Sequence, residues 1–294
     1  MESLATASGH TNALAGALVL VGWFVFFYLY FGYGITLGYH RLLTHKSLVV
    51  PKWLSYLIVS GGYLCLMGSP IVWVGVHRLH HQKSDIIGED PHTPQEGFLH
   101  AMFGWMTRMR NIQSDEELRR QVKDLASDPV FRRLGDGHTA EQALLCLGIC
   151  IAWRVLICLV FGWAVLAVNL LATAVVFFAP HMVNTVCHIP RFGYRSHDTV
   201  DRSRNVWWVG LWALGEGWHN NHHAIPTSAR HGFQWFEIDI TWYGILLLEK
   251  LGLATKVVRP VAKPTRAMEL QLVPEDVAAD AGTTKPEPTT SAVR

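Results

Sequence analysis

Residues 13 to 38, with the sequence ALAGALVLVGWFVFFYLYFGYGITLG, form an uncharged apolar run that limits how this chain can fold. About 20 such residues are enough for one helix to cross a bilayer, so the run predicts a transmembrane helix. No Lys or Arg precedes it, whereas the basic stretch HRLLTHK follows directly. Because Lys and Arg are enriched on the cytoplasmic side, we expect the N-terminus outside and His40 at the cytoplasmic end.

A second apolar region contains enough residues for two more spans, with a break near Gly162. The predicted spans, residues 142–162 and 163–187, would run out and back and return Asn184 and His188 to the cytoplasmic face. Half of the 294 residues are hydrophobic and only 16% are charged. This balance is typical of a membrane-embedded protein that also has a polar side.

The apolar stretch at residues 53–76 decides the topology. The chain between His45 and His77 is too short for two spans. A single crossing would therefore place these two histidines on opposite faces, about 30 Å apart. Because Gly61-Gly62 and Gly68-Ser69-Pro70 interrupt the stretch, we expect an interfacial or re-entrant helix that returns to the same side.

Polar sequence fills residues 82–140, where SDEELRRQVKDL begins with Ser114 as an N-cap candidate. We expect a cytoplasmic helical insert there. After residue 258 the chain is rich in Pro, Thr, Ala, Glu and Asp and has no aromatic residues, so residues 259–294 are predicted to be a disordered tail. The expected fold is an all-α, multi-pass integral membrane domain over residues 1–258, with interfacial helices and a cytoplasmic helical cap.

Charge and cysteine content exclude several classes of protein. The net charge is +2, and no basic run is long enough to follow a phosphate backbone, so we expect no nucleic-acid partner. The five cysteines lie in apolar stretches and form no CxxC pair. A fused iron–sulfur module is therefore not expected, and any electrons must come from outside the chain.

Nine of the 16 histidines fall in four short groups, HRLLTH, HRLHH, NTVCH and HNNHH. A helix turns by about 100° per residue, so the outer pair of an HxxHH box lies on one face while the middle residue points away. Two facing boxes therefore predict two metals, each held by the outer pair of one box and the middle residue of the other. The candidate ligands are His40, His45, His77, His80, His81, His188, His219, His222 and His223.

The number of ligands bears on which metal is bound. Neutral imidazole suits Zn, Cu, Fe and Ni alike. Nine histidines exceed the eight ligands of two four-coordinate structural zinc sites, which favours iron with a higher coordination number. Asn184 lies four residues before His188, on the same helical face, and is a candidate for a water-mediated or outer contact.

Several other residues have simpler structural roles as alternatives to a functional one. His92 and His231 are expected to hydrogen-bond loops rather than bind iron, and His181 to pack in a helix. Glu216 is either an outer carboxylate to His219 or a surface residue. Arg154 lies inside a span, where a charge costs about 2.5 to 3.5 kcal/mol and marks function or a buried partner that the sequence does not identify. Among five tryptophans expected at the interface or core, two are weak candidates for lining an acyl tunnel: Trp207 and Trp208.

The chain closely resembles the membrane fatty-acid desaturases of the stearoyl-type, acyl-CoA or acyl-lipid delta-9 family. The resemblance covers roughly residues 32 to 258 and is carried by GYHRLLTHKS, WVGVHRLHHQKSD, DPHTPQEGF, GYRSHDTVDRSRNVWWVGLWALGEGWHNNHH and SARHGFQWFEIDITW. Three sequence differences stand out. One span precedes His40 where the family usually has two, PHMVNT replaces the usual TWLVNS, and Ala101-Met102 replaces Ser-His.

This resemblance implies two non-haem irons that use O₂ to remove two hydrogens from an unactivated acyl chain. One iron would take His40, His45, His77, His81 and His222. The other would take His80, His188, His219 and His223, with Asn184 acting through water. The product would have a cis double bond near position 9, and an external electron donor, ferredoxin or cytochrome b5-like, would supply the electrons.

Two other functions compete with desaturation. A hydroxylase on a related histidine-rich scaffold would give an alcohol instead of an alkene. A metal transporter would place its ligands near the bilayer midplane, whereas these histidines lie at span ends and in polar segments. The sequence leaves open whether the acyl group arrives on a lipid, on CoA or on a carrier protein.

Overall fold

The computed structural model describes residues 2–260, and almost all of its regular structure is helical. Within these residues there is no strand, only isolated bridges such as Val49 with Thr255. Three helices are long and apolar enough to cross a membrane: Leu14–Thr44, Ala140–Phe161 and Trp163–Val186. The predicted all-helical membrane fold is confirmed. Apart from its first two residues, the predicted tail at 259–294 lies outside the described residues.

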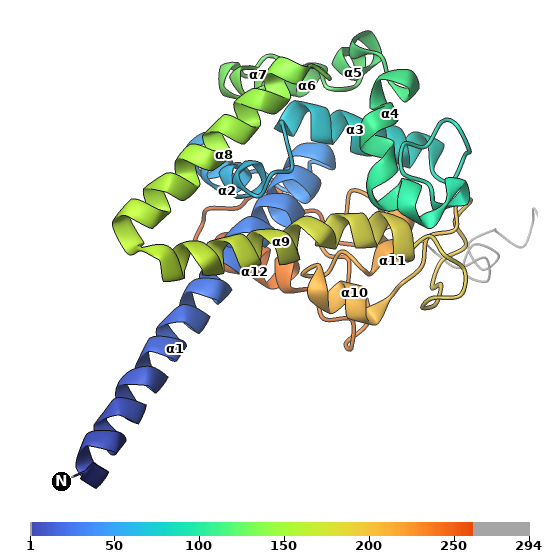
Figure 1. Ribbon diagram of the computed structural model, residues 1–294. Helices are drawn as coiled ribbons and strands as arrows, with labels where there is room; N and C mark the ends of the chain where they lie inside the picture. The colour runs from blue at the N-terminus through green and yellow to red at the C-terminus, as the bar shows by residue number, and fades with distance from the viewer. Residues whose placement is uncertain (1, 261–294) are drawn as a thin grey trace, which may run out of the picture. The chain divides into compact units, whose positions relative to one another are not determined.

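Figure 1 shows α1 as a rod that projects from a compact body, while α8 and α9 form a hairpin along that body. The short helices α4 to α7 gather at one end, and α10 to α12 lie below α9 in this view. The elements are α1 (Glu2–Tyr33), η1 (Gly34–Thr44), α2 (Lys52–Leu64), α3 (Pro70–Lys83), η2 (Pro94–Glu96), η3 (His100–Gly104), α4 (Trp105–Ile112), α5 (Asp115–Gln121), α6 (Lys123–Ala126), α7 (Pro129–Leu134), α8 (Ala140–Phe161), α9 (Trp163–Val186), α10 (Trp207–Trp212), α11 (His219–Ala224) and α12 (Ile240–Lys250).

The first long helix changes type before it ends. From Gly34 to Thr44 it is a π-helix, in which each N–H bonds to the carbonyl five residues back. At its end the His45 N–H donates to the His40 carbonyl at 3.1 Å. In an α-helix these two residues would point about 140° apart. The wider π turn lets both rings reach one site.

Residues 53–76 are divided between α2 and α3, and neither helix has the length of a membrane span. Gly61 and Gly62 do not interrupt α2. They let it pack against the first helix so closely that a Cβ on Gly61 would lie 2.2 Å from the Tyr30 carbonyl oxygen. The break comes at Gly68, which has a φ of 75°. Ser69 then caps α3 by accepting from the Ile71 N–H. That this segment returns to the same membrane face stays a prediction.

The α8–α9 hairpin turns at Gly162, where φ is 84° and glycine avoids the strain that a side chain would add. The partners of Arg154, which the sequence did not identify, are now clear. Its guanidinium donates to the carbonyl oxygens of Cys150 (2.8 Å) and Leu64 (3.2 Å) and to the Thr173 hydroxyl (3.0 Å). Arg154 therefore caps the C-terminal end of α2 from inside the hairpin, where cations are favourable.

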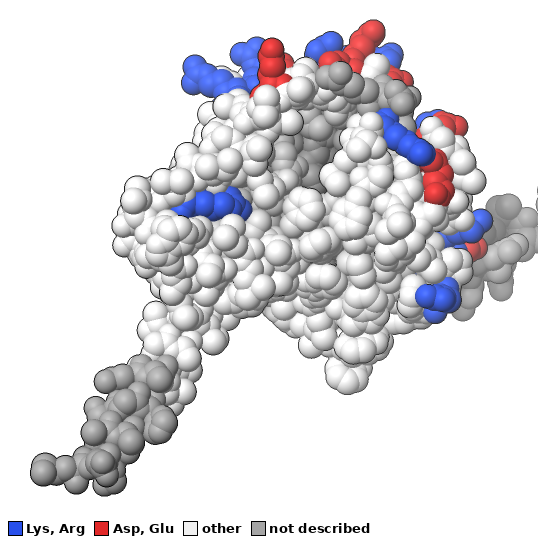
Figure 2. Space-filling view, in the orientation of Figure 1, with Lys and Arg blue, Asp and Glu red and all other residues white. Residues whose placement is uncertain are grey.

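The polar insert folds into short capped helices. Ser114 and Glu117 form a reciprocal capping box at the start of α5, and Asp128 caps α7. Figure 2 shows charged side chains of both signs at the end where α5 to α7 lie, whereas most of the visible surface elsewhere is uncharged. This separation of charged and uncharged surface fits a protein with one aqueous and one lipid-facing side.

Candidate metal centre

The nine histidines gather at two neighbouring places. One group, here called the five-histidine group, consists of His40, His45, His77, His81 and His222. The other, the four-histidine group, consists of His80, His188, His219 and His223. Within each group one ligand atom from every ring lies within 4.8 Å of all the others. The memberships are the same as those of the two ligand sets that the resemblance implied.

The two HxxHH boxes, HRLHH in α3 and HNNHH in α11, exchange their middle residues. In α3 the outer pair, His77 and His81, belongs to the five-histidine group, while His80 points to the other group. In α11 the outer pair, His219 and His223, belongs to the four-histidine group, while His222 crosses over. The 100° turn per residue explains this division.

Distances between ring nitrogens show what kind of ion these groups fit. In the five-histidine group the Nε2 atom of His222 lies 3.1 Å from that of His40 and 2.9 Å from that of His81. In the other group Nε2 of His219 lies 3.1 Å from that of His188 and 3.0 Å from that of His223. With a metal–nitrogen distance of about 2.1 Å, neighbouring ligands are about 3.0 Å apart at 90° and about 3.4 Å apart in a tetrahedron. The spacing favours octahedral geometry.

Buried nitrogens without partners also point to a bound ion. Nε2 of His45 and Nε2 of His80 are buried and have no hydrogen-bond partner. Such an atom costs free energy unless something satisfies it. Imidazole nitrogens are metal ligands, so the residues present fit a pair of metal ions.

Four carboxylates orient the rings from behind. Nδ1–H of His80 donates to Asp90 (3.0 Å), that of His188 to Asp85 (2.9 Å), and that of His223 to Asp201 (2.7 Å). In the five-histidine group, His40 Nδ1 lies 2.6 Å from Glu216 Oε2. A proton held on Nδ1 leaves the Nε2 lone pair free to face a metal.

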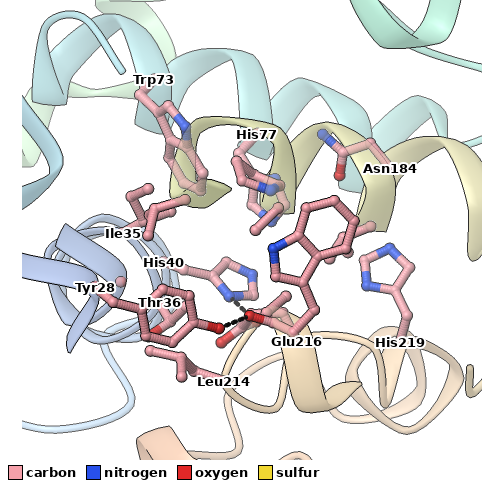
Figure 3. A pocket seen from close by; sticks show the side chains of 17 residues that line it. Tyr28, Ile35, Thr36, His40, Trp73, His77, Asn184, Leu214, Glu216 and His219 are labelled. Atoms are coloured by element: carbon pink, nitrogen blue, oxygen red, sulfur yellow. Dashed lines mark hydrogen bonds and ion pairs between the residues drawn. The ribbon is translucent and has the colours of Figure 1, made fainter. Parts of the chain in front are cut away.

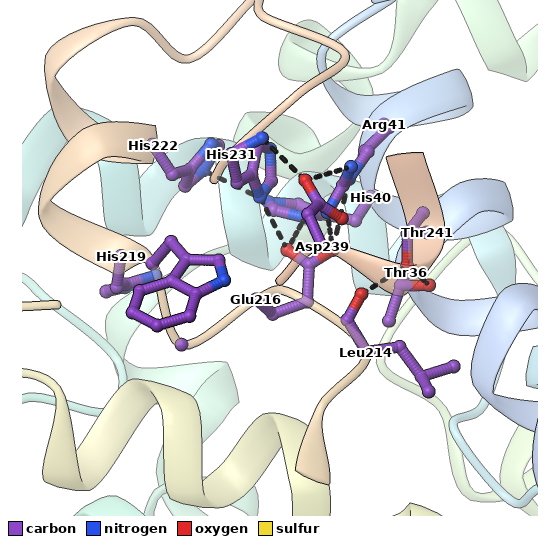
Figure 4. A network of polar contacts seen from close by, with 12 residues as sticks. Thr36, His40, Arg41, Leu214, Glu216, His219, His222, His231, Asp239 and Thr241 are labelled. Carbon is purple, nitrogen blue, oxygen red and sulfur yellow. Dashed lines mark hydrogen bonds and ion pairs between the residues drawn. The ribbon is translucent and has the colours of Figure 1, made fainter. Parts of the chain in front are cut away.

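Glu216 contacts His40, not His219, and it is buried rather than on the surface. Its other oxygen accepts from Arg41 at 3.0 Å, and Arg41 also donates to both oxygens of Asp239, each at 3.0 Å. Figure 4 shows this network beside His222 and His231. The Arg41 side chain is completely buried, so its charge depends on these two carboxylates.

Burial keeps most of the rings in the neutral form that metal binding needs. It lowers the pKa of His77, His81 and His222 well below the ordinary value, and the neighbouring histidines lower it further. Burial also lowers the pKa of His223, to about 4 even though Asp201 opposes the shift. For His80 burial also lowers the pKa, but Asp90 together with Asp85 and Asp201 outweighs burial and raises it.

Two further histidines lie at the edges of the groups. His231 is buried with Nδ1 at 3.2 Å from Glu216 Oε2. His92 is buried with Nδ1 at 3.5 Å from Asp90 Oδ1. Both rings therefore face a carboxylate that already holds a candidate ligand. His181 donates from Nδ1 to the Phe177 carbonyl (2.8 Å), within its own helix.

An apolar pocket meets both groups. Its polar end is lined by His40, His77, His219 and Glu216, and Asn184 lies beside it (Figure 3). Its walls include Tyr28, Ile35, Trp73, Val176, Trp212 and Leu214. Trp207 and Trp208, the two tryptophans suggested by the sequence, do not line this cavity, and Trp207 is 63% exposed. Trp73 and Trp212 do line it.

Sequence reasoning missed the buried Arg41 and most of the carboxylates: Asp85, Asp90, Asp201 and Asp239. Asp85 and His188 are 103 positions apart, so no local spacing could pair them. A usable signal existed, because these carboxylates stand inside the motifs HHQKSD, DPHTP, HDTVD and FEIDITW.

Comparison with known proteins identifies the family. The sequence model described as fatty acid desaturase matches residues 15–243. The sn-1 stearoyl-lipid 9-desaturase of Anabaena variabilis is 42% identical over 85% of this chain and 86% of its own length. The sn-2 palmitoyl-lipid 9-desaturase of Nostoc is 42% identical (83% and 81%), and Arabidopsis delta-9 acyl-lipid desaturase 2 is 40% identical (84% and 78%). This chain therefore belongs to the fatty acid desaturase family.

Proposed function

We propose that this protein inserts a cis double bond, near position 9, into a saturated acyl chain carried by a membrane lipid. The family membership supports desaturation, and the names of its relatives support a lipid-bound substrate and the position. The relatives act on stearoyl or palmitoyl lipids by name. An acyl-CoA substrate is the alternative that the sequence alone left open.

Two non-haem irons are proposed as the cofactors, one in each histidine group. The observation that carries this proposal is the set of Nε2 distances, 2.9 to 3.1 Å, which suits 90° angles between ligands. The rings of the five-histidine group would hold one iron, and those of the four-histidine group would hold the other. Asn184, beside the cavity, is proposed to hold a water toward the four-histidine group.

The reaction consumes one O₂, two electrons and two protons for each pair of hydrogens removed, and it releases an alkene and two waters. Bound irons would supply the oxidising power for breaking an unactivated C–H bond. The chain's own residues position the substrate. Trp73, Trp212 and Leu214 enclose the acyl chain and exclude water, while His40, His77 and His219 mark the end of the cavity where the reacting carbons must lie.

Orientation in the membrane is part of the proposal. We propose a multi-pass protein in contact with membrane lipid, with both histidine groups at the cytoplasmic face. The basic stretch after the first span supports this orientation. Ferredoxin or a cytochrome b5-like protein in that compartment is the proposed electron donor.

The proposal is tested by fatty-acid analysis. Cells that express the chain, or its His222→Ala variant, are compared by gas chromatography and mass spectrometry with assignment of double-bond position. We expect a new 9-monounsaturated acid that is absent from the variant. His138→Gln is the matched control, since His138 lies outside both groups and contacts Gln113. A hydroxy acid, or no product from iron-loaded enzyme supplied with electrons, would overturn the proposal.

A further inference from the structure

We propose that the loop formed by residues 191–202 is the docking surface for a small acidic one-electron carrier protein, and that electrons reach the four-histidine group first. The inference rests on the proposed function, because desaturation needs electrons from outside. It goes beyond that function by naming the surface and the metal group that receive them.

Two short connections join this loop to the four-histidine group. Asp201 accepts from Nδ1 of His223 at 2.7 Å. The backbone N–H of Arg202 donates to Asp85 Oδ2 at 2.7 Å, and the same oxygen accepts from Nδ1 of His188 at 2.9 Å. Both Val200 and Arg202, the neighbours of Asp201, are exposed. A carrier bound here is separated from two candidate ligands by only a few bonds. Electron tunnelling weakens steeply with distance, so this short separation favours electron transfer to the four-histidine group.

The exposed charged side chains of the loop are mostly cationic. Arg191, Arg195 and Arg202 are exposed, whereas Asp198 is the exposed carboxylate of the loop and lies 3.8 Å from Arg195. Among the described residues, no carboxylate lies within ion-pair distance of Arg191 or Arg202. A surface with a net positive charge attracts an acidic partner and speeds its approach.

Apolar side chains accompany these charges. Val200 is fully exposed at the tip of the loop. The contact between Arg202 and Asp85 brings in residues 84–89, where Ile86 is 45% and Ile87 67% exposed. Exposed apolar side chains with a charged rim are the usual make-up of a protein interface. A small patch of this kind suits a carrier that must bind, deliver one electron and leave.

The surface near the five-histidine group differs. Lys46 follows His45 directly but is paired with Asp124 at 2.8 Å, and Asp124 also holds Arg78. The short helices around it carry both signs, as Figure 2 shows at that end of the molecule. The two cations nearest His45, Lys46 and Arg78, are therefore paired with the same carboxylate, whereas among the described residues Arg191 and Arg202 have no carboxylate within ion-pair distance.

Electron balance is satisfied by two visits of the carrier in each turnover. Each reduced carrier loses one electron and is released oxidised. The two electrons, with two protons from solvent and the two hydrogens of the substrate, end in the two waters formed from O₂.

Binding to a carrier tests the proposal without any turnover. The full-length protein, loaded with Zn²⁺ in lipid nanodiscs, is titrated with an acidic [2Fe–2S] ferredoxin and, separately, with the soluble domain of cytochrome b5. We expect Arg195→Glu/Arg202→Glu to lower the affinity for at least one carrier by about tenfold or more and to flatten its salt dependence. Val200→Ser should weaken binding and keep the salt dependence. The matched charge reversal Arg119→Glu/Arg132→Glu should leave the affinity unchanged.

The proposal fails if neither carrier binds the unmodified protein, or if the two charge reversals lower the carrier affinity equally. It also fails if Arg195→Glu/Arg202→Glu lowers binding to anionic vesicles but leaves carrier binding unchanged. A reduced viologen dye separates this inference from the proposed function, since it needs no docking surface. Iron-loaded Arg195→Glu/Arg202→Glu should make product at the normal rate with the dye and slowly with the carrier. If the dye yields no product from the unmodified protein, the proposed function fails, while the binding result still decides the docking surface.

Discussion

Two helices, α3 and α11, contribute to both histidine groups, but the groups are supported differently. In the four-histidine group, three of four rings donate to a carboxylate: His80 to Asp90, His188 to Asp85, and His223 to Asp201. In the five-histidine group, among the described residues, only His40 faces a carboxylate, Glu216, and Arg41 offsets its charge.

This difference affects the metals that the groups would hold. Carboxylates behind imidazole rings raise ligand basicity, and nearby negative charge stabilises a more highly charged ion. The four-histidine group has fewer ligands but a more negative surrounding. The five-histidine group has more ligands, and its one carboxylate is tied into a buried ion network. We therefore expect metal binding in the four-histidine group to depend on its outer carboxylates. Metal binding in the five-histidine group should depend on its number of rings.

Loss of a ligand should have the largest effect and should separate the groups. His219→Ala leaves three rings in its group, whereas His77→Ala leaves four. Both should lose desaturase activity by more than about 100-fold, since loss of an outer partner alone costs about 10- to 100-fold. Metal analysis of each purified variant should show about one iron per chain for His219→Ala and a larger residual content for His77→Ala. Equal losses of iron in the two variants would contradict the proposed difference between the two groups.

Removal of the buried cation should destabilise the five-histidine side most. Arg41→Met leaves Glu216 and Asp239 buried without their guanidinium. Breaking a buried ion pair on one side costs on the order of 3 to 5 kcal/mol. Thermal unfolding of the metal-free protein should show a large drop in Tm. The matched variant is Arg78→Met, whose side chain is 17% exposed and pairs with a part-exposed carboxylate. If both variants unfold at the same temperature, the Arg41 network does not stabilise the five-histidine group more than an ordinary ion pair would.

The sequence was sufficient to expect an all-helical membrane protein, since long apolar runs and the 3.6-residue period act locally. The division of each HxxHH box between two groups also follows from helix geometry alone, although metal binding itself stays a prediction. The π-helix did not follow, because no residue in GITLGYHRLLT marks a change of helix type. The position of His45 beside His40, which follows from the π-helix, could therefore be seen only in the structure.

Tertiary contacts account for the other gaps. Gly61 and Gly62 looked like helix breakers but serve close packing, which only the neighbouring helix can reveal. Both alternatives for Glu216, a contact with His219 and a surface position, were wrong, because sequence proximity to His219 is a poor guide when the chain turns sharply at Gly215, where φ is 115°. Asp90 is only ten positions from His80, but Asp85 is 103 positions from His188, and pairing over such a separation depends on the complete fold.

Change of an outer carboxylate should have a smaller effect and act on one group. Asp201→Asn keeps a polar group beside His223 but removes the charge. We expect metal to be held about 10- to 100-fold less tightly in the four-histidine group, with the five-histidine group unchanged. Stepwise removal of Co²⁺ by a chelator, followed by absorption spectroscopy, would separate the two groups. Loss of both ions together would show that the groups are coupled and that the comparison is too simple.

The smallest effect is expected for a carboxylate that faces cations but no ring. Burial opposes ionisation of Asp124, but Arg78 and Lys46 outweigh it and lower its pKa to about 2. A lowered pKa contributes stability above the unfolded value of about 4, and the contribution is lost as pH falls from about 4 toward 2. Because Lys46 is 64% exposed, solvent screening limits the contribution to at most about 1 kcal/mol. Asp124→Asn should therefore lower Tm slightly at pH 7, lose that difference at low pH, and keep its full metal content. A fall in metal content would mean that metal retention follows general stability. The effect of Asp201→Asn could not then be attributed to its contact with His223.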